Sequence, residues 1–412
     1  MQTNLADFIR DTREGKEADA ILRSCVHCGF CTATCPTYQL LGDELDGPRG
    51  RIYLIKQVLE GKTPTAKTQE HLDRCLTCRN CESTCPSGVQ YGRLIDIGRK
   101  VVSDRVAYKP IQKFKRALLR ELLPRKNVFG PAMKIGQLVR PMLPAALREK
   151  VPARQPSGIW PTRQHTRTML LLDGCVQPSM APNINAATAR VFDALDVQLL
   201  VAQKAGCCGA IRHHMNDHDG ALDQARNNID AWWPAIESGA EEIVMTASGC
   251  GVMVKDYGHL LAHDPAYAEK ALHVSGMTKD LSEILPEFEA QLMERLAGKI
   301  DQRVVWHPPC TLQHGQQIRG KVEGVLRAVG VDVQLCKDSH LCCGSAGTYS
   351  VLQPELSHQL RDRKIANLEA TGADTIVSAN IGCLTHLQGG TQKPVRHWIE
   401  LIDGALTASQ QA

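Results

Sequence analysis

The chain has 412 residues, a net charge of +4 and 43% hydrophobic residues, which suits two or three globular domains with sizeable cores. The charged N-terminal stretch lacks the apolar segment of a secretory signal, and no run of about 18 apolar residues predicts a transmembrane helix. Seventeen cysteines in such a chain favour metal or redox chemistry over disulfide bonds.

Two runs of four cysteines come first in the chain. The run CVHCGFCTATCP begins at Cys25 and CLTCRNCESTCP begins at Cys75, both with the spacing Cys-x2-Cys-x2-Cys-x3-Cys followed by proline. Zinc sites usually join cysteine pairs from separated segments, whereas this spacing is typical of bacterial [4Fe–4S] clusters, in which the fourth cysteine of a run binds the other cluster. The runs therefore predict one cluster on Cys25, Cys28, Cys31 and Cys85, and a second on Cys75, Cys78, Cys81 and Cys35.

A helix is expected between the two runs, in the segment GPRGRIYLIKQVLEG that ends at Gly61. Its apolar residues at helical spacing are Ile52, Leu54, Ile55, Val58 and Leu59. Cluster loops separated by a helix resemble the helical ferredoxin domain of succinate dehydrogenase and fumarate reductase iron–sulfur subunits. Arg49 and Arg51 could lie near a cluster, but we expect them to be solvated or paired with a carboxylate.

The next segment is strongly basic. From Lys100 to Arg167 there are 16 Lys and Arg and three acidic residues, a net charge of +13. It is rich in proline and contains the amphipathic stretch KFKRALLRELLPRK. Interleaved apolar and basic residues favour docking on an anionic membrane surface or an acidic partner over a solvated connector. Because no recognised nucleic-acid fold accompanies the charge, we expect no nucleic acid as partner.

The rest of the chain contains a duplication with a period of about 135 residues. Each copy has one cysteine, then the triplet CCG, then a further cysteine: Cys175, Cys207, Cys208 and Cys250 in the first copy, and Cys310, Cys342, Cys343 and Cys383 in the second. Short apolar runs alternate with helical segments, which predicts parallel sheets. The cysteines follow the carboxyl ends of strands, so each copy should bring its four thiols together, although buried thiols in tight turns are the simpler alternative.

These residues resemble the cysteine-rich CCG domain of heterodisulfide reductase subunits and of 2-hydroxy acid dehydrogenase iron–sulfur subunits. With the two four-cysteine runs and the basic linker, nearly the whole chain resembles the glycolate oxidase (glycolate dehydrogenase) iron–sulfur subunit family. Anaerobic glycerol-3-phosphate dehydrogenase and lactate-utilisation subunits share this architecture. The resemblance implies an electron-transfer subunit, not catalytic alone, that passes electrons from an FAD-containing dehydrogenase subunit to a quinone or another respiratory acceptor.

The chain departs from the full CCG pattern, which ends in Cys-x-x-Cys and supplies five thiolates per half. Met253 and His386 stand at the two fifth positions. His386 could replace a thiolate, and Cys336, whose counterpart in the first copy is Val201, could act only in the second half. We therefore expect the halves to differ, with the second better able to hold metal. A further cluster and a zinc ion both stay open for these halves.

The resulting prediction is a multidomain protein in four regions: a helical ferredoxin domain (1–100), a basic linker (101–166), and two α/β CCG half-domains with parallel sheets (167–300 and 301–412). No dinucleotide fingerprint, P-loop or nucleophile elbow is evident, so we expect no catalytic residue and no flavin on this chain. The histidines of RHHMNDHDG are expected to be surface polar groups.

We expect a cytoplasmic protein on the inner face of the cell membrane. The competing hypotheses are a heterodisulfide-reductase-like enzyme that acts through its CCG halves, and a scaffold with structural zinc.

Overall fold

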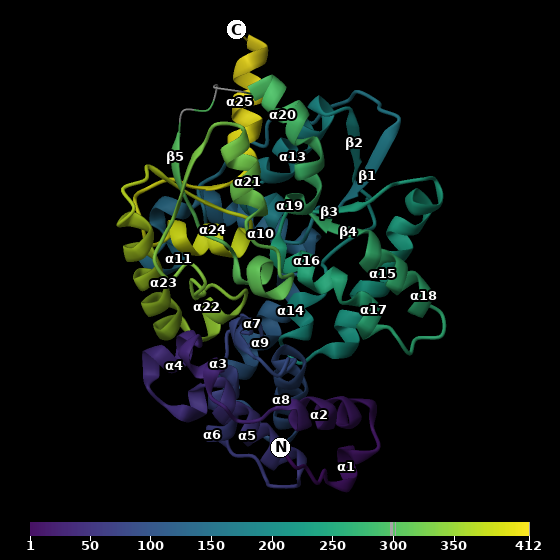
Figure 1. Ribbon diagram of the computed structural model, residues 1–412, viewed down its shortest axis with the longest axis vertical. Coiled ribbons are helices and arrows are strands. Elements are labelled where there is room, and N and C mark those ends of the chain that lie inside the picture. Colours follow the sequence, from purple (N-terminus) through teal and green to yellow (C-terminus); the bar gives the residue numbers. More distant parts are fainter. Residues whose placement is uncertain (297–299, 301, 412) are drawn as a thin grey trace.

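The computed structural model describes residues 1–296, 300 and 302–411. Helices from the N-terminal part of the chain form one end of the molecule, and two small sheets covered by helices lie side by side at the other end (Figure 1). Among the described residues, no helix combines the length and apolar character needed to span a bilayer.

The N-terminal region is entirely helical, as predicted. Its elements are α1 (Asp7–Arg10), α2 (Arg13–Ser24), α3 (Phe30–Ala33), α4 (Pro36–Leu41), the 3-10 turn η1 (Glu44–Asp46), α5 (Pro48–Leu59), α6 (Ala66–Asp73), α7 (Asn80–Thr84) and α8 (Tyr91–Arg105). The expected helix between the two cysteine runs is α5, whose Ile52, Ile55 and Leu59 are buried. It packs closely on α8 because Gly98 has no side chain, and a Cβ there would lie 2.6 Å from Cγ1 of Ile55.

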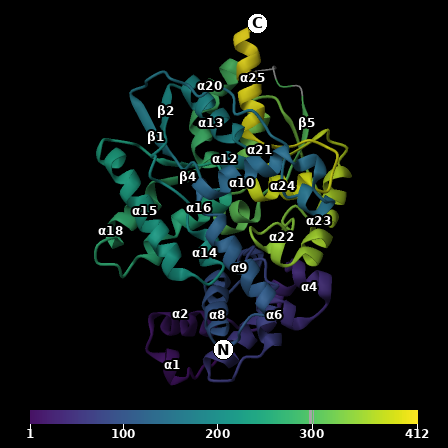
Figure 2. The ribbon, with the colours of Figure 1, turned by 180° about the vertical axis from the view of Figure 1, so that it is seen from behind.

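The basic segment is structured and fastened to the rest of the molecule. It forms α9 (Pro110–Leu122), α10 (Lys126–Leu138), the 3-10 turn η2 (Arg140–Met142) and α11 (Ala145–Arg148). From behind, α9 and α10 rise from the N-terminal helices between the two halves (Figure 2). Ion pairs join this segment to all three other regions: Arg116 with Asp73 at 2.8 Å, Glu121 with Arg212 at 2.8 Å, Lys126 with Asp173 at 2.9 Å, and Glu149 with Arg361 at 3.2 Å. The segment is therefore a docked connector.

The first half contains a four-stranded parallel sheet in the order β2-β1-β3-β4. Its strands are β1 (Arg167–Leu171), β2 (Val197–Leu200), β3 (Ile243–Met245) and β4 (Thr278–Asp280). Its helices are α12 (Gln177–Met180), α13 (Asn183–Ala194), α14 (Ala210–His213), α15 (His218–Glu237), α16 (Ser248–Lys255), α17 (Tyr257–Leu260), α18 (Ala268–Met277), α19 (Leu281–Ile284), η3 (Leu285–Phe288) and α20 (Glu289–Leu296). The apolar runs predicted as strands form β1, β2 and β3.

The second half repeats this topology, because its parallel sheet has the order β6-β5-β7-β8. Its strands are β5 (Arg303–Trp306), β6 (Asp332–Leu335), β7 (Thr375–Ser378) and β8 (Val395–His397). Its helices are the turn η4 (Thr311–Gly315), α21 (Lys321–Ala328), α22 (Tyr349–Leu352), α23 (Pro354–Glu369), α24 (Ile381–Gln388) and α25 (Ile399–Gln411). The expected boundary between the halves falls at 300 and 301, and residue 301 lies outside the described residues; the four-region division stays a prediction.

The two halves share one apolar core. Phe192 of the first half and Trp306 and Trp398 of the second belong to the same cluster, and all three side chains are buried. Burying each large apolar side chain contributes roughly 1.5–3 kcal/mol. Helix α25 packs along α13, where Arg190 forms two hydrogen bonds of 2.7 Å with the Asp403 carboxylate. The duplicated halves therefore form one packed body.

Candidate metal centres

The thiols predicted for the first cluster come together around a hollow at the surface of the N-terminal region. Cys25 ends α2, Cys28 lies in the following loop, Cys31 lies on α3 and Cys85 ends α7, and all four line this hollow. Burial and the nearby Cys25 thiol raise the pKa of Cys31 to about 11. Four clustered thiols are unfavourable as bare anions, and a bound metal removes that penalty.

The second predicted group is more deeply enclosed. It contains Cys35, which begins α4, Cys75 after α6, Cys78 in the loop, and Cys81 on α7. Burial raises the pKa of Cys78 and Cys81 well above the ordinary value, and the other thiols of the group add to this shift. The thiols thus gather in the two expected groups, with Cys35 and Cys85 exchanged between the runs, and their binding of clusters stays a prediction.

The backbone wraps around each group in the same way. His27 and Gly29 in the first run have φ of 58° and 86°, and Thr77 and Arg79 in the second have 52° and 60°. This left-handed conformation is unfavourable for residues other than glycine, and such residues are concentrated at functional sites. At Gly29 it also brings the chain against Arg49, because a Cβ would lie 2.8 Å from Nη1 of that residue.

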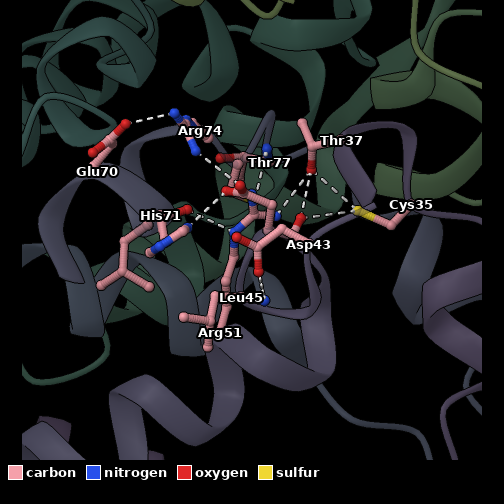
Figure 3. Close-up of polar contacts among 12 residues, drawn as sticks. Cys35, Thr37, Asp43, Leu45, Arg51, Glu70, His71, Arg74 and Thr77 are labelled. Atoms are coloured by element: carbon pink, nitrogen blue, oxygen red, sulfur yellow. Dashed lines mark hydrogen bonds and ion pairs between the residues drawn. The ribbon is translucent and has the colours of Figure 1, made fainter. Parts of the chain in front are cut away.

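A buried arginine supports the second group (Figure 3). Cys35 Sγ lies 3.3 Å from Oγ1 of Thr37, which accepts a 3.1 Å hydrogen bond from Arg51. Arg51 is 1% exposed and pairs with Asp46 at 3.3 Å. Burial disfavours its charge, but the neighbouring Cys75 thiol and the Asp46 carboxyl raise its pKa above the usual range. The expectation of a carboxylate partner is confirmed, and Arg49 likewise pairs with Glu44 at 2.6 Å.

In the first CCG half the four predicted cysteines also meet. Cys175 follows β1, Cys207 and Cys208 lie between β2 and α14, and Cys250 lies on α16. Hydrogen bonds from the Cys175 and Cys208 thiols lower the pKa of Cys207 well below its ordinary value. Cys208 also contacts Cys250. Met253, which takes the fifth position, packs in the apolar cluster around these thiols.

The second half has the same arrangement. Cys310 donates a hydrogen bond to Cys342 at an Sγ–Sγ distance of 3.8 Å, and Cys343 contacts both Cys342 and Cys383. Asn380 Nδ2 donates to Cys383 Sγ at 3.6 Å. Four converging thiols in each half are a stronger signal of metal binding than isolated buried cysteines.

The glycine of each CCG triplet is required by the backbone. Gly209 has φ of 97° and Gly344 has φ of 88°, both in the left-handed region. A Cβ at Gly344 would lie 2.6 Å from the carbonyl oxygen of Ser357, and one at Gly209 would lie 3.0 Å from that of Ala221. Gly209 thus lies tightly against α15 and Gly344 against α23, where a side chain would not fit.

The two auxiliary ligands considered from the sequence differ in their surroundings. His386 places Nε2 3.1 Å from Oγ of Ser357, and burial lowers its pKa to about 3. Cys336 is buried beside Lys364, within the apolar cluster that contains Cys343 and Cys383. The imidazole beside the thiols is instead His307, which the sequence argument missed. The sequence did contain a sign of this difference. His307 stands three residues before Cys310 in WHPPC, and the first copy has Leu172 at the same distance before Cys175 in LLDGC.

The second half lies directly against the second thiol group. Cys78 packs on an apolar cluster that contains Cys310 and Cys342. Ser83 Oγ lies 3.0 Å from Nδ1 of His314, and Asn80 donates to the carbonyl oxygen of His340 at 3.3 Å. A centre in the second half would therefore be a direct neighbour of the second N-terminal centre.

The first half meets the N-terminal region through charged groups. His213 and His214 each lie 3.4 Å from a carboxylate oxygen of Asp96 on α8. Burial opposes the charge of Asp96, but both histidines lower its pKa well below the ordinary value, and Asp96 raises the pKa of His213. These histidines, expected to be surface polar groups, thus contact a carboxylate across the boundary between the two regions.

Comparisons with known proteins agree with this organisation. Residues 21–89 match the family described as 4Fe-4S dicluster domain, and residues 169–255 and 304–388 match the family described as cysteine-rich domain. The glycolate oxidase iron-sulfur subunit of Escherichia coli (strain K12) is 54% identical over 407 residues, which cover 98% of this chain and 99% of that protein. The chain belongs to the glycolate oxidase iron–sulfur subunit family.

A more distant relative supports the same family. The probable glycolate oxidase iron-sulfur subunit of Bacillus subtilis (strain 168) is 30% identical, over 90% of this chain and 89% of that protein. Lactate utilization protein A of Bacillus licheniformis is 26% identical over 52% of this chain and 88% of its own length. The dicluster match covers both four-cysteine runs. As a glycolate oxidase iron–sulfur subunit homologue, the chain is an electron-transfer component of an oxidoreductase complex.

The residues present fit iron–sulfur centres. All described cysteines are free thiols, and the eight N-terminal ones form two groups of four with positive side chains beside them. Four thiolates are the usual ligand set of a [4Fe–4S] cluster.

Proposed function

We propose that the chain is an electron carrier in glycolate oxidation. It would accept electrons from an FAD-containing subunit, which oxidises glycolate, and pass them to a quinone or another respiratory acceptor. Two [4Fe–4S] clusters, on Cys25, Cys28, Cys31 and Cys85 and on Cys75, Cys78, Cys81 and Cys35, would supply one-electron carriers for a flavin that is reduced by two electrons. The observation that carries this proposal is the pair of crossed thiol groups. The substrate is proposed from the relatives that are named glycolate oxidase subunits.

The chain's own residues hold and insulate these sites. Arg51 and Arg49 keep positive charge beside the thiolates, which stabilises an anionic centre. Tyr91 is buried and donates to Cys75 Sγ at 3.7 Å. Ile52 and Val89 line the first hollow and exclude water from its inner side.

The first thiol group supports a contact with the flavoprotein. Cys28 is exposed, and on either side of it Val26 is 67% exposed and Phe30 is 62% exposed. Apolar side chains at the surface beside a redox site suit a protein partner that must approach closely. The second group is enclosed against the second CCG half, so the Cys28 edge is the accessible side for electron exchange.

A reconstitution experiment tests the function. The isolated chain, purified anaerobically, should not oxidise glycolate with any artificial acceptor, because no flavin site is proposed on it. Activity should appear when the FAD-containing subunit is added, and glycolate should be preferred over glycerol 3-phosphate and lactate. Turnover by the isolated chain with flavin excluded spectroscopically would instead support the hypothesis of a self-contained enzyme.

We further propose that α9 docks on an anionic membrane surface. Its residues Ile111, Phe114 and Leu118 are 71%, 66% and 44% exposed and follow one side of the helix, and Lys113 and Lys115 are exposed among them. An amphipathic helix with basic and apolar residues lies in the plane of a membrane interface. Binding to the flavoprotein through α9 is the competing outcome of the experiment on this helix.

A further inference from the structure

His307 is a buried histidine without an evident structural role for its ring. It follows β5, is 1% exposed, and its backbone is bound within the sheet: the N–H donates to Val377 and the carbonyl oxygen accepts from Ser378. Neither ring nitrogen has a hydrogen-bond partner among the described residues. Leaving a buried polar group unpaired costs roughly 1–3 kcal/mol, so the ring calls for a partner.

The ring faces thiols. One ring nitrogen of His307 and the Sγ atoms of Cys343 and Cys383 all lie within 4.8 Å of one another, and all three residues are buried. A buried imidazole and two buried thiols at this distance present one nitrogen and two sulfur donors toward a common point, as a metal site requires.

The nearby thiol spacing suits metal ligation. The Sγ atoms of Cys310 and Cys342 are 3.8 Å apart. Two sulfur ligands of one tetrahedral ion, each about 2.3 Å from the metal, are separated by about 3.8 Å. The buried Lys364 ammonium lies beside Cys343 and Cys342 and compensates negative charge that thiolates would introduce.

The first half lacks this imidazole. Leu172 takes the equivalent position before Cys175 and is buried in the apolar cluster around the first-half thiols. The two halves have the same topology and the same four cysteines, so this replacement is the clearest difference between their thiol sites.

We propose that His307 is a metal ligand together with Cys343 and Cys383, so that the second half holds a centre with mixed imidazole and thiolate ligation. This inference goes beyond the proposed function, which requires only the eight N-terminal cysteines. Zinc and iron both accept this donor set. An imidazole nitrogen adds a donor without the negative charge of a further thiolate, and histidine ligation raises the reduction potential of iron–sulfur centres. We therefore expect the metal site of the second half to differ from that of the first half in its ligand atoms and, if it holds iron, in its reduction potential.

The native chain can be tested without any substitution. The full-length protein is purified anaerobically with and without 15N-labelled histidine, and iron and zinc are measured per chain. We expect metal beyond about eight N-terminal irons. If the extra metal is iron, pulsed EPR of the reduced protein should show a coupling that changes with the histidine label. If it is zinc, X-ray absorption should show nitrogen and sulfur donors. No additional metal, or sulfur donors alone, would overturn the proposal.

Two substitutions taken from the first half locate the ligand. His307→Leu introduces the residue of the first copy and should remove the histidine-derived signal or the extra metal. His386→Met is the matched control, because His386 is also buried in the second half but binds Ser357, and it should leave both unchanged. Retention of the nitrogen donor in His307→Leu would overturn the assignment. Because glycolate oxidation in the reconstituted complex is measured separately, failure here leaves the proposed function intact.

Discussion

Cys78 of the second four-cysteine run packs against Cys310 of the second CCG half. Leu76, Tyr349 and Leu360 belong to the same buried cluster and separate this contact from water. The candidate centres therefore follow one another through the molecule: the exposed Cys28 edge, the first thiol group, the second thiol group and the second-half site. The first-half site is outside this line, since the first half meets the N-terminal region through polar contacts, such as Asp96 with His213 and Arg93 with Asp256, and not through packed thiols.

The crossed ligand sets predict which double substitutions share an effect. Cys28→Ser and Cys85→Ser should each remove about four irons and the same EPR signal, because both residues belong to the first group. Combining them should cost no further iron, whereas Cys28→Ser with Cys35→Ser should remove about eight. The iron content per chain and the EPR spectrum of each variant, purified anaerobically, distinguish these outcomes. Equal losses in Cys28→Ser and its combination with Cys35→Ser would mean that each run binds its own cluster.

The surface around Cys28 should bind the flavoprotein. Replacing Val26 and Phe30 with serine should weaken that association by at least about tenfold, the factor for 1.4 kcal/mol, while iron content stays unchanged. Titration of reconstituted activity with the FAD-containing subunit measures the affinity. Leu272→Ser is the control, since Leu272 is 69% exposed but lies on α18 in the first half. Equal affinity of both variants would remove this surface as the docking site.

The buried pair of Arg51 and Asp46 should be important for the N-terminal fold. Asp46→Asn leaves a buried guanidinium without its charged partner, which costs roughly 3–5 kcal/mol. Glu44→Gln, two residues away, removes only a partly exposed ion pair with Arg49, worth at most about 1 kcal/mol. Loss of cluster absorbance during denaturant unfolding should occur at a clearly lower midpoint in Asp46→Asn. Coinciding midpoints of the two variants would contradict this ranking.

Helix α9 should bind anionic vesicles through Lys113 and Lys115, which form no ion pair with the part of the chain that the structure describes. Arg116, Arg120, Arg125 and Lys126 are ion-paired within the chain, so they are poor sites for such a test. Reversing Lys113 and Lys115 to glutamate should weaken vesicle binding at least about 30-fold, from about 1 kcal/mol per basic residue. The effect should shrink with salt, because exposed charges are screened within about 8 Å at physiological ionic strength.

The control for α9 changes the charge equally elsewhere. Lys16 and Lys62, both exposed in the N-terminal region, are replaced with glutamate in the control variant. Equal flotation of both variants with anionic vesicles would show that only net charge matters. Unchanged flotation together with weaker binding to the FAD-containing subunit would assign α9 to that partner.

The grouping of the cysteines could be predicted from the sequence because its signals are local. Cysteine spacing determines how the chain wraps around each group, and short apolar runs mark β1, β3, β5 and β7. The edge strands β4 and β8, with the sequences TKD and VRH, escaped prediction, unlike β2 and β6 at the opposite edges. They are three residues long and partly polar, so their sequences carry no strand pattern. Their conformation is decided by pairing with the neighbouring strand of the sheet.

The missing details depend on which side chains meet in three dimensions. His386 occupies the sequence position of a fifth ligand, yet a hydrogen bond to Ser357 holds its ring elsewhere. His307 lies three residues before Cys310, but only pairing of β5 with β7 brings it to Cys383. The charge pattern of the basic segment did not reveal that several of its charges pair with the chain itself, and its docking on a membrane stays a prediction.

The packing of α25 on α13 constrains how the protein can be made. Arg190 and Asp403 are 213 residues apart, so the ribosome releases α13 long before the helix that covers it. Domains generally begin to fold during synthesis, and apolar surface exposed at that stage favours aggregation. The side of α13 that contacts α25 therefore stays uncovered until the whole second half has been translated. Stable insertion of metal into the CCG halves is accordingly expected after translation, once both halves have closed on each other.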